Sequence, residues 1–217
     1  MTDYYHRLQQ FFQSHSRRGR HRYFFERGIL KDQEEWKRAA ILIPLFEDHD
    51  TLKAVYIQRS RMILQGGHEA VHSGQIAFPG GKIEKGETAL QAALREAGEE
   101  IALSPDEVEI LGKLGVFSTL ASHYLTDAFV GWLSRPPELV KNQAEVDRIF
   151  QVPLEAILSQ HNRALNLLRW EDILALHYHW KDPDDNRSIC IWGMTGRITW
   201  VLLEVLFFQT EGRLTAK

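Results

Sequence analysis

Apolar residues along this chain are spaced in two ways, and together they predict a mixture of helices and strands. Apolar or aromatic residues three to four positions apart between Asp3 and His15 predict a short amphipathic helix. Two apolar runs, Ala39 to Leu45 and Leu52 to Gln58, read as strands. A polar turn, Glu47 to Asp50, separates them, so the pattern favours an antiparallel hairpin.

The rest of the chain continues this mixture of elements. A Gly-rich passage, Gly66 to Gly81, precedes a helix expected from about Thr88 to Ile101. Further strands are expected at 108–117, 124–133, 174–180 and 188–192, and further helices at 153–158 and 195–208. Strands and helices do not alternate strictly, so the pattern favours an α+β fold, with a sheet between helices, over a doubly wound fold.

Composition and charge narrow the class of protein. The chain has 217 residues, of which 44% are hydrophobic and 25% charged, which suits one sizeable domain. The single cysteine, Cys190, lies in an apolar run, where we expect it to pack rather than react. No stretch approaches the roughly 18 apolar residues of a membrane span. The N-terminus does not resemble a signal peptide. We therefore expect a soluble, cytoplasmic protein that does not enter a membrane.

The chain divides into a helical and basic N-terminal extension, residues 1–35, and a main domain, residues 36–217. The net charge of −3 gives no reason to expect a nucleic acid as partner. One basic cluster, Arg17 to Arg22, has two interpretations. It is either a solvated linker after the first helix or a contact for an anionic substrate or partner.

Most candidate functional residues lie on the helix expected at Thr88 to Ile101. At about 100° per residue, Glu96, Glu99 and Glu100 cluster on one side of this helix. Four apolar residues form a stripe on the opposite side, expected to face the core: Leu90, Leu94, Ala97 and Ile101. Like charges one turn apart repel each other, and a divalent cation reverses the sign of that interaction. Oxygen ligands of this kind suit magnesium. The alternative is an ordinary solvated face of glutamates.

Two neighbouring features favour the metal-binding interpretation. Arg95 lies beside the acids, and Glu87 precedes it by eight residues, close enough for an ion pair. Phe78 to Gly81 places glycine-rich backbone directly upstream, where a free carbonyl could reach the same metal.

This arrangement resembles the Nudix box, in which glycine, five residues, glutamate and seven residues precede Arg-Glu-x-x-Glu-Glu. The matching positions are Gly81, Glu87, Arg95, Glu96, Glu99 and Glu100. The resemblance implies an α/β/α sandwich with a mixed β-sheet, and magnesium- or manganese-dependent hydrolysis of a nucleoside diphosphate linked to another group. One departure is Ala102, which stands where the box usually has glycine.

The resemblance also implies roles for individual residues. The metal ligands would be Glu96, Glu99, Glu100 and the carbonyl of Gly80, and the supporting residues Gly81, Glu87 and Arg95. Glu99 and Glu100 are the first candidates for catalytic residues. Glu145 is either an extra ligand or base, or a carboxylate at the start of a helix.

Residues outside the box resemble coenzyme A pyrophosphatases. The matching segments are Gln58-Arg59-Ser60, His72 to Gly81, Ala144 to Leu154 and Ile191 to Arg197. The resemblance implies cleavage of coenzyme A or an acyl-coenzyme A into 4′-phosphopantetheine and adenosine 3′,5′-bisphosphate. The candidate substrate-binding residues are Arg59, His72, Gln75 and Phe78. An apparent insertion, Arg61 to Val71, replaces an arginine of that group's signature, and His68, Arg61 or the basic cluster could compensate for it.

Two alternatives remain open at this point. The chain could hydrolyse another nucleotide, such as ADP-ribose, a dinucleoside polyphosphate or a capped nucleotide. It could also be a Nudix-like module that binds a nucleotide without turnover, although three clustered carboxylates favour catalysis. The sequence leaves the oligomeric state open, with a homodimer among the alternatives, and it does not separate magnesium from manganese.

Overall fold

The computed structural model describes residues 3–16, 36–61, 74–119, 123–167 and 177–208. The basic cluster Arg17 to Arg22, both His68 and His72, and all of the apparent insertion except Arg61 lie outside the described residues.

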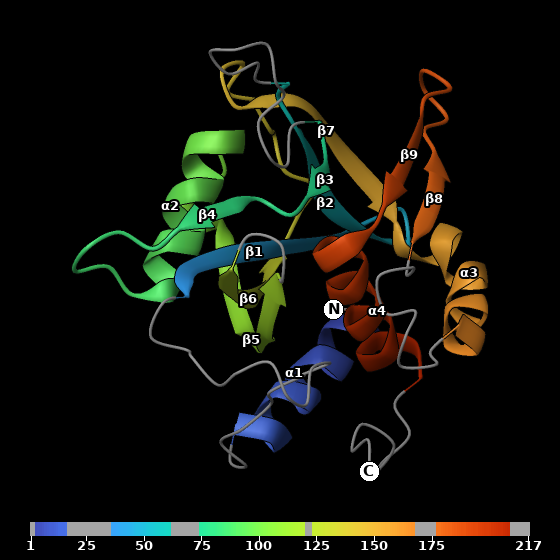
Figure 1. Ribbon diagram of the computed structural model, residues 1–217. Helices are drawn as coiled ribbons and strands as arrows, with labels where there is room; N and C mark the ends of the chain where they lie inside the picture. Colours follow the sequence, from blue (N-terminus) through green and yellow to red (C-terminus); the bar gives the residue numbers. More distant parts are fainter. Residues whose placement is uncertain (1–2, 17–35, 62–73, 120–122, 168–176, 209–217) are drawn as a thin grey trace.

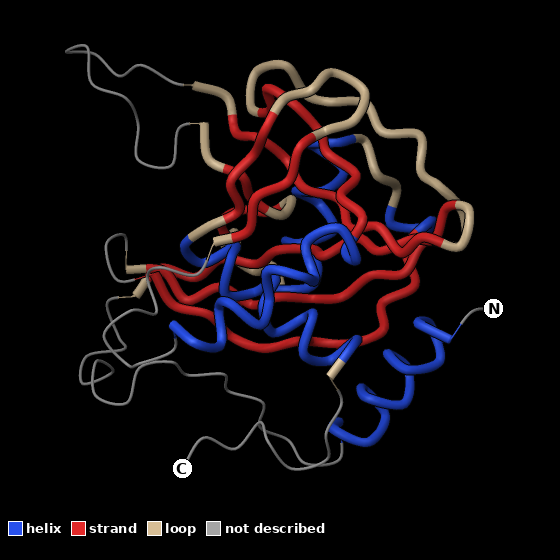
Figure 2. The backbone as a smooth tube through the Cα atoms, turned by 90° about the vertical axis from the view of Figure 1, so that its right-hand side faces the viewer, coloured by secondary structure: helices blue, strands red, loops and turns tan. Residues whose placement is uncertain are grey.

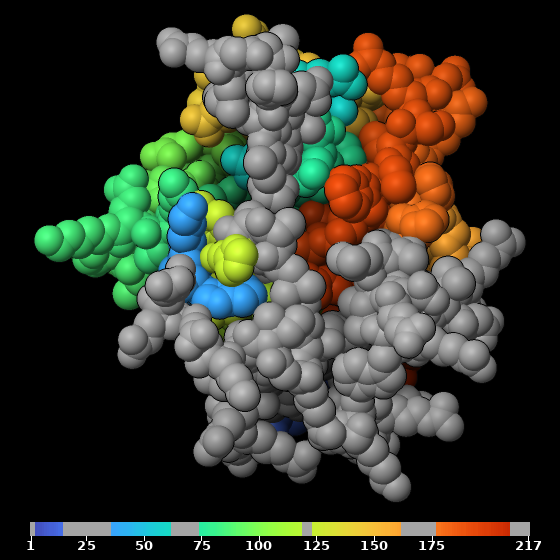
Figure 3. All heavy atoms as spheres, in the orientation of Figure 1, coloured from blue at the N-terminus to red at the C-terminus, as the bar shows by residue number. Residues whose placement is uncertain are grey.

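A seven-stranded mixed sheet forms the centre of the molecule (Figure 1). Its middle strand, β1 (Lys37–Asp48), pairs antiparallel with β2 (Thr51–Arg59) and parallel with β6 (Tyr124–Leu133). The remaining strands pair antiparallel: β5 (Val108–Thr119) with β6, β4 (Gly80–Lys82) with β1, and both β3 (Ile76–Ala77) and β7 (Val146–Pro153) with β2. At one end of the parallel pair, β1 (blue) and β6 (yellow-green) reach the surface side by side (Figure 3). The predicted β1–β2 hairpin is confirmed.

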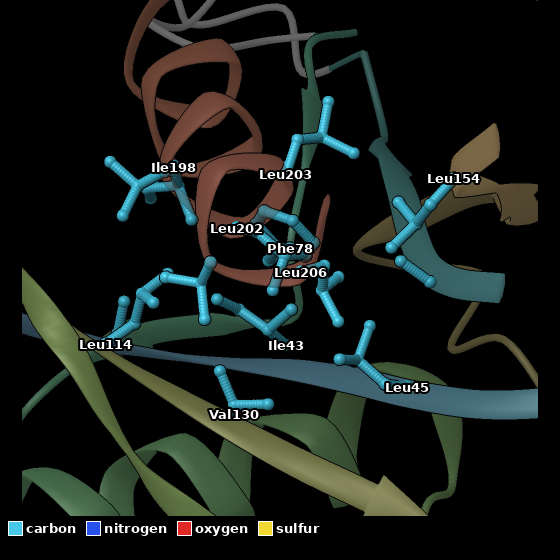
Figure 4. Packing of buried hydrophobic residues seen from close by; sticks show 14 of the residues in the cluster. Ile43, Leu45, Phe78, Leu114, Val130, Leu154, Ile198, Leu202, Leu203 and Leu206 are labelled. Atoms are coloured by element: carbon cyan, nitrogen blue, oxygen red, sulfur yellow. The ribbon is translucent and has the colours of Figure 1, made fainter. Parts of the chain in front are cut away.

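Helices cover both faces of this sheet, as the tube view shows (Figure 2). Successive side chains of β1 point to opposite faces, and all those from Ala39 to Phe46 are buried, so this part of the strand is apolar on both sides. Ala40, Leu42 and Phe46 pack with helix α2 (Ala89–Ile101) on one face. Ile43 and Leu45 pack on the other face, beneath helix α4 (Gly193–Phe207) (Figure 4). The expected α+β sandwich is confirmed.

The second face is shared by three helices. Helix α4 is buried nearly all round because α1 (Asp3–Ser16) and α3 (Leu154–Leu167) pack against it in addition to the sheet. Tyr5, Leu8, Phe11 and Phe12 of α1 are buried in the same hydrophobic cluster. The predicted N-terminal helix is confirmed, and it belongs to the same folded unit as the sheet.

Most predicted elements are present, but three strands were not expected: the short β3 and β4, and the longer β7. Strand β7 pairs with nearly the whole of β2, from Lys53 to Arg59. The helix expected at 153–158 continues to Leu167. Strands β8 (Tyr178–Lys181) and β9 (Ser188–Ile191) form the late hairpin around the polar turn, as predicted. None of the described helices is long and apolar enough to cross a membrane.

Candidate functional site

The helix that carries the acidic cluster has well-defined ends. Thr88 caps its N-terminus, because the Thr88 hydroxyl accepts a hydrogen bond from the Gln91 backbone N–H while the Gln91 side chain accepts one from the Thr88 N–H. At the other end Ala102 adopts a left-handed conformation with φ of 55°, and its N–H donates to the carbonyl of Gly98. Alanine therefore takes the conformation that the box usually assigns to glycine, at a modest cost in backbone strain.

Arg95 binds the supporting residue Glu87 and two of the acids at once. Its guanidinium donates to both carboxylate oxygens of Glu87, at 2.9 and 3.2 Å, which confirms the predicted ion pair. It also donates to Glu96 at 3.0 Å, to Glu99 at 2.9 Å and to the carbonyl of Lys82 at 3.1 Å. Hydrogen bonds from Arg95 and from the Glu84 N–H lower the pKa of Glu87. The loop before α2 is thereby fixed to the helix.

Glu100 lies in a different environment from the other acids. Its residue exposure is 0%, and it lies on the buried side of α2 with Ala93, Ala97 and Ile101. The prediction that all three glutamates lie opposite the core is wrong for Glu100, and Leu90 of the predicted stripe is only partly buried. Burial raises the pKa of Glu100 to about 7 against the opposing effects of Arg59 and a backbone N–H.

Two glycines of β4 form the other wall of the site. The N–H of Gly80 donates to Glu100 Oε2 at 2.8 Å, and Gly80 has φ of 151°, which a side chain rarely adopts. A Cβ at Gly80 would lie 2.3 Å from the carbonyl oxygen of Ala40, and a Cβ at Gly81 would lie 2.4 Å from a carboxylate oxygen of Glu96. Position 80 requires glycine because the backbone of the central strand approaches it closely, whereas a side chain at position 81 would displace the Glu96 carboxylate.

Arg59, at the end of β2, faces Glu100 across this wall. Its Nη2 lies 3.5 Å from Glu100 Oε1, and its Nη1 donates to the Gly80 carbonyl at 3.4 Å. The pairing between β2 and β7 shifts between Gln58 and Arg59, so that Asp147 is left without a partner on β2. This bulge ends the regular ladder where the Arg59 side chain joins the site.

Glu145 lies close enough to affect the buried acids. Its charge raises the pKa values of both Glu96 and Glu100, although burial is the larger cause for each. Its carbonyl accepts a hydrogen bond from the Ser60 N–H at 2.8 Å, which places Glu145 beside the end of β2. Glu145 precedes strand β7, so its interpretation as a carboxylate at the start of a helix is wrong.

The candidate substrate residues have different outcomes. The Gln75 carbonyl accepts from the Arg59 N–H at 3.0 Å, so Gln75 adjoins the site. Phe78 is only 2% exposed and stacks on Tyr56 with ring centroids 4.4 Å apart, which makes it a core residue rather than a surface for substrate. His72 lies outside the described residues.

The residues present fit a divalent cation, although the carboxylates do not surround one point. Within the described ranges, no three acidic, histidine or cysteine side chains are arranged together as ligands. Glu96 and Glu99 bind Arg95 instead, and Glu100 faces Arg59. Glu100 Oε1 is nevertheless buried without a hydrogen-bond partner, and the guanidinium of Arg59 contacts both this oxygen and the Gly80 carbonyl. A hard cation satisfies such oxygens, so the donor set is suitable for magnesium or manganese.

Sequence reasoning missed two backbone groups that organise the site. The Lys82 carbonyl holds Arg95, and the Gly80 N–H holds Glu100. The short run of glycines before the helix was the available signal, and it indicated an unusual backbone but not which groups bind the acids.

The chain belongs to the Nudix family, because residues 36–171 match the NUDIX domain. It is 33% identical over 177 residues to the mitochondrial Nudix hydrolase 15 of Arabidopsis thaliana, a match covering 78% of this chain and 59% of that protein. It is 29% identical over 171 residues to an uncharacterized Nudix hydrolase, NudL, of Pectobacterium atrosepticum, covering 78% of this chain and 82% of the relative.

Solved structures support the same fold. A MutT/nudix family protein from Enterococcus faecalis aligns with a TM-score of 0.51 at 16% identity, covering 92% of this chain and 74% of that one. At this identity the likeness shows the fold alone.

Proposed function

We propose that this chain is a metal-dependent Nudix pyrophosphohydrolase, which cleaves a phosphoanhydride bond in a nucleoside diphosphate derivative. The observation that carries the proposal is the Glu100 carboxylate, which is buried and has one oxygen without a hydrogen-bond partner. A buried carboxylate without full compensation is unfavourable for stability, so its presence is best explained by a ligand that binds it.

The chain's own residues position the reaction. Glu96, Glu99, Glu100 and the Gly80 carbonyl would hold the cation, which when bound would neutralise the pyrophosphate and lower the pKa of water. Arg95 keeps Glu96 and Glu99 oriented, because its planar guanidinium is fixed by both oxygens of Glu87.

Glu145 is the candidate general base. It is exposed, so it can meet water, and it lies within electrostatic range of both Glu96 and Glu100. Glu99 remains an alternative, since more than half of its side chain is accessible.

The proposed substrate is coenzyme A or an acyl-coenzyme A, cut into 4′-phosphopantetheine and adenosine 3′,5′-bisphosphate. Support comes from the segments around Arg59 and Gln75 that resemble coenzyme A pyrophosphatases. Arg59 also contacts Glu100 and the Gly80 carbonyl, and its N–H donates to the Gln75 carbonyl. A positively charged side chain at this place suits a substrate phosphate.

A panel of nucleotides with magnesium tests the proposal. Coenzyme A, its dephospho form, ADP-ribose and a dinucleoside polyphosphate are offered separately, and mass spectrometry identifies the products. We expect Glu100→Gln to lose at least about two orders of magnitude in turnover, the scale of losing a charge stabiliser at the reacting phosphate. Glu47→Gln, at the far end of β1, makes the same charge change and keeps the wild-type rate.

Each outcome has a separate meaning. Cleavage of ADP-ribose but not coenzyme A refutes the substrate and keeps the enzyme class. Binding of a nucleotide without turnover under any condition refutes catalysis and makes the chain a binding module. Wild-type turnover in Glu100→Gln removes Glu100 from the mechanism.

A further inference from the structure

Two arginines face the acids of α2, and the structure holds them in different ways. Arg95 makes five hydrogen bonds of 2.9–3.2 Å, to Glu87, Glu96, Glu99 and the Lys82 carbonyl. Within the described part of the chain, the Arg59 guanidinium contacts Glu100 at 3.5 Å and the Gly80 carbonyl at 3.4 Å. Both Arg59 contacts lie at the long limit of polar interactions, so Arg95 is fixed and Arg59 is loosely held.

The backbone of Arg59 is fixed even though its side chain is not. Its N–H donates to the Gln75 carbonyl at 3.0 Å, and its carbonyl accepts from the Gly74 N–H at 3.1 Å. The side chain is 37% exposed, so its end can turn from Glu100 into solvent without moving a strand. Only the side-chain rotamer has to change.

The two groups that Arg59 contacts are also two of the proposed cation ligands, Glu100 and the Gly80 carbonyl. Two positive charges only a few ångströms apart repel each other strongly in a partly buried site. A divalent cation and the guanidinium of Arg59 therefore cannot both occupy this position.

We propose that Arg59 is an exchangeable counter-ion, which neutralises Glu100 before metal binds and binds a phosphate of the substrate afterwards. The inference rests on the proposed function, because it assumes that Glu100 and Gly80 are cation ligands. Displacement turns the guanidinium outward, where its planar donors match a phosphate group. Metal binding thus creates a substrate contact, and by reciprocity substrate phosphate favours metal binding.

This arrangement explains how a buried acid persists in the metal-free protein. Removing the counter-ion of a buried carboxylate is strongly destabilising in general. Arg95 cannot supply that charge, since its donors are taken by other acceptors. Arg59 supplies it, and the long distances keep the contact easy to break.

Calorimetric titration of magnesium into substrate-free protein at pH 8.5 tests the exchange without an activity measurement. We expect Arg59→Gln to bind magnesium about tenfold more tightly than wild type, because the competing charge is gone. Arg59→Lys retains the charge and stays within about threefold of wild type. Arg135→Gln is the matched control, because Arg135 is highly exposed and contacts only Glu107, at 3.8 Å, among the described residues.

A second titration tests the substrate half of the inference. Methylenediphosphonate serves as a pyrophosphate probe that is not hydrolysed, and magnesium affinity is measured with and without it. Direct contact between the probe and magnesium strengthens binding in every variant, so the informative quantity is the difference between variants. The factor by which the probe strengthens magnesium binding should be about tenfold larger in wild type than in Arg59→Gln.

The results separate this inference from the proposed function. Magnesium affinity in Arg59→Gln that equals or falls below wild type overturns the exchange and leaves the metal site intact. Equal strengthening by the probe in both proteins overturns the phosphate contact. Absence of magnesium binding in wild type and all three variants overturns the proposed metal site, and the inference with it.

Discussion

Alanine substitutions at the two adjacent glycines of β4 should affect different properties: stability at position 80 and catalysis at position 81. At position 80 a new Cβ meets backbone: the Ala40 carbonyl oxygen at 2.3 Å and Ile41 Cα at 2.6 Å. The φ of 151° adds strain for any side chain. Gly80→Ala is therefore expected to lower the free energy of unfolding by about 2–6 kcal/mol, combining backbone strain with overpacking.

At position 81 the new Cβ meets the flexible end of a side chain. The Glu96 carboxylate oxygen lies 2.4 Å from it, and ordinary contact begins near 3.4 Å, so the carboxylate must move by about 1 Å. Gly81→Ala should change the free energy of unfolding by less than about 1 kcal/mol, since alanine also restricts the unfolded chain. A ligand displaced by 1 Å should lower kcat/KM about 100-fold.

Urea denaturation and steady-state kinetics, applied to both variants, decide between these outcomes. Wild-type kcat/KM in Gly81→Ala would refute the role assigned to Glu96, because the carboxylate must move in that variant. Wild-type stability in Gly80→Ala would show that β4 does not approach β1 as described.

Three further predictions concern the surroundings of the acids. Phe78→Leu should lower the free energy of unfolding by about 1–2 kcal/mol in urea, through lost stacking on Tyr56, with KM unchanged; a raised KM at unchanged stability would return Phe78 to the substrate site. Arg95→Lys loses the bidentate contact with Glu87, so the apparent affinity for magnesium should fall 10- to 100-fold, roughly the usual range for supporting residues. The measurement is a magnesium titration of activity, and a wild-type titration curve would contradict this role. Magnesium at about 100 times its dissociation constant should raise Tm by about 5–10 °C by scanning calorimetry, with a much smaller shift in Glu100→Gln; equal shifts place the bound magnesium elsewhere.

The sequence predicted the parts of the site that depend on short separations. The spacing of Glu87, Arg95 and the following acids lies within one loop and one helix, so helical geometry alone brings these side chains together. The same holds for the β1–β2 hairpin, whose strands are joined by a short polar turn.

Long-range packing explains why the main sequence-based predictions for the site were wrong. Of the stripe predicted to face the core, Ala97 and Ile101 are buried, but Leu90 and Leu94 are only partly buried. The small residues Ala92 and Ala93 are buried on α2 in their place. Small residues allow the helix to approach the strands closely, and that approach carries Glu100 into the interior.

The sequence pattern also did not predict the pairing between distant strands. Strand β7 contains Asp147 and Arg148, which break a simple alternation, and its partner β2 lies about 90 residues earlier. Phe78 stands beside the glycines of the site in sequence, yet its ring packs on Tyr56 on the other face of the sheet. Proximity in sequence to a functional motif therefore did not indicate which side of the sheet a residue faces.

The glutamates of α2 are chemically identical, but they differ in burial and in the arginine that compensates their charge. Glu96 and Glu100 are one turn apart, but Glu96 is compensated by the fixed Arg95, whereas Glu100 has the loosely held Arg59. A cation that binds both acids must displace Arg59, the more weakly held of the two arginines. Arg95 stays in place, because its contacts with Glu87 do not depend on Glu96. The order of charge exchange at the site is therefore set by tertiary packing around two arginines rather than by the spacing of the glutamates.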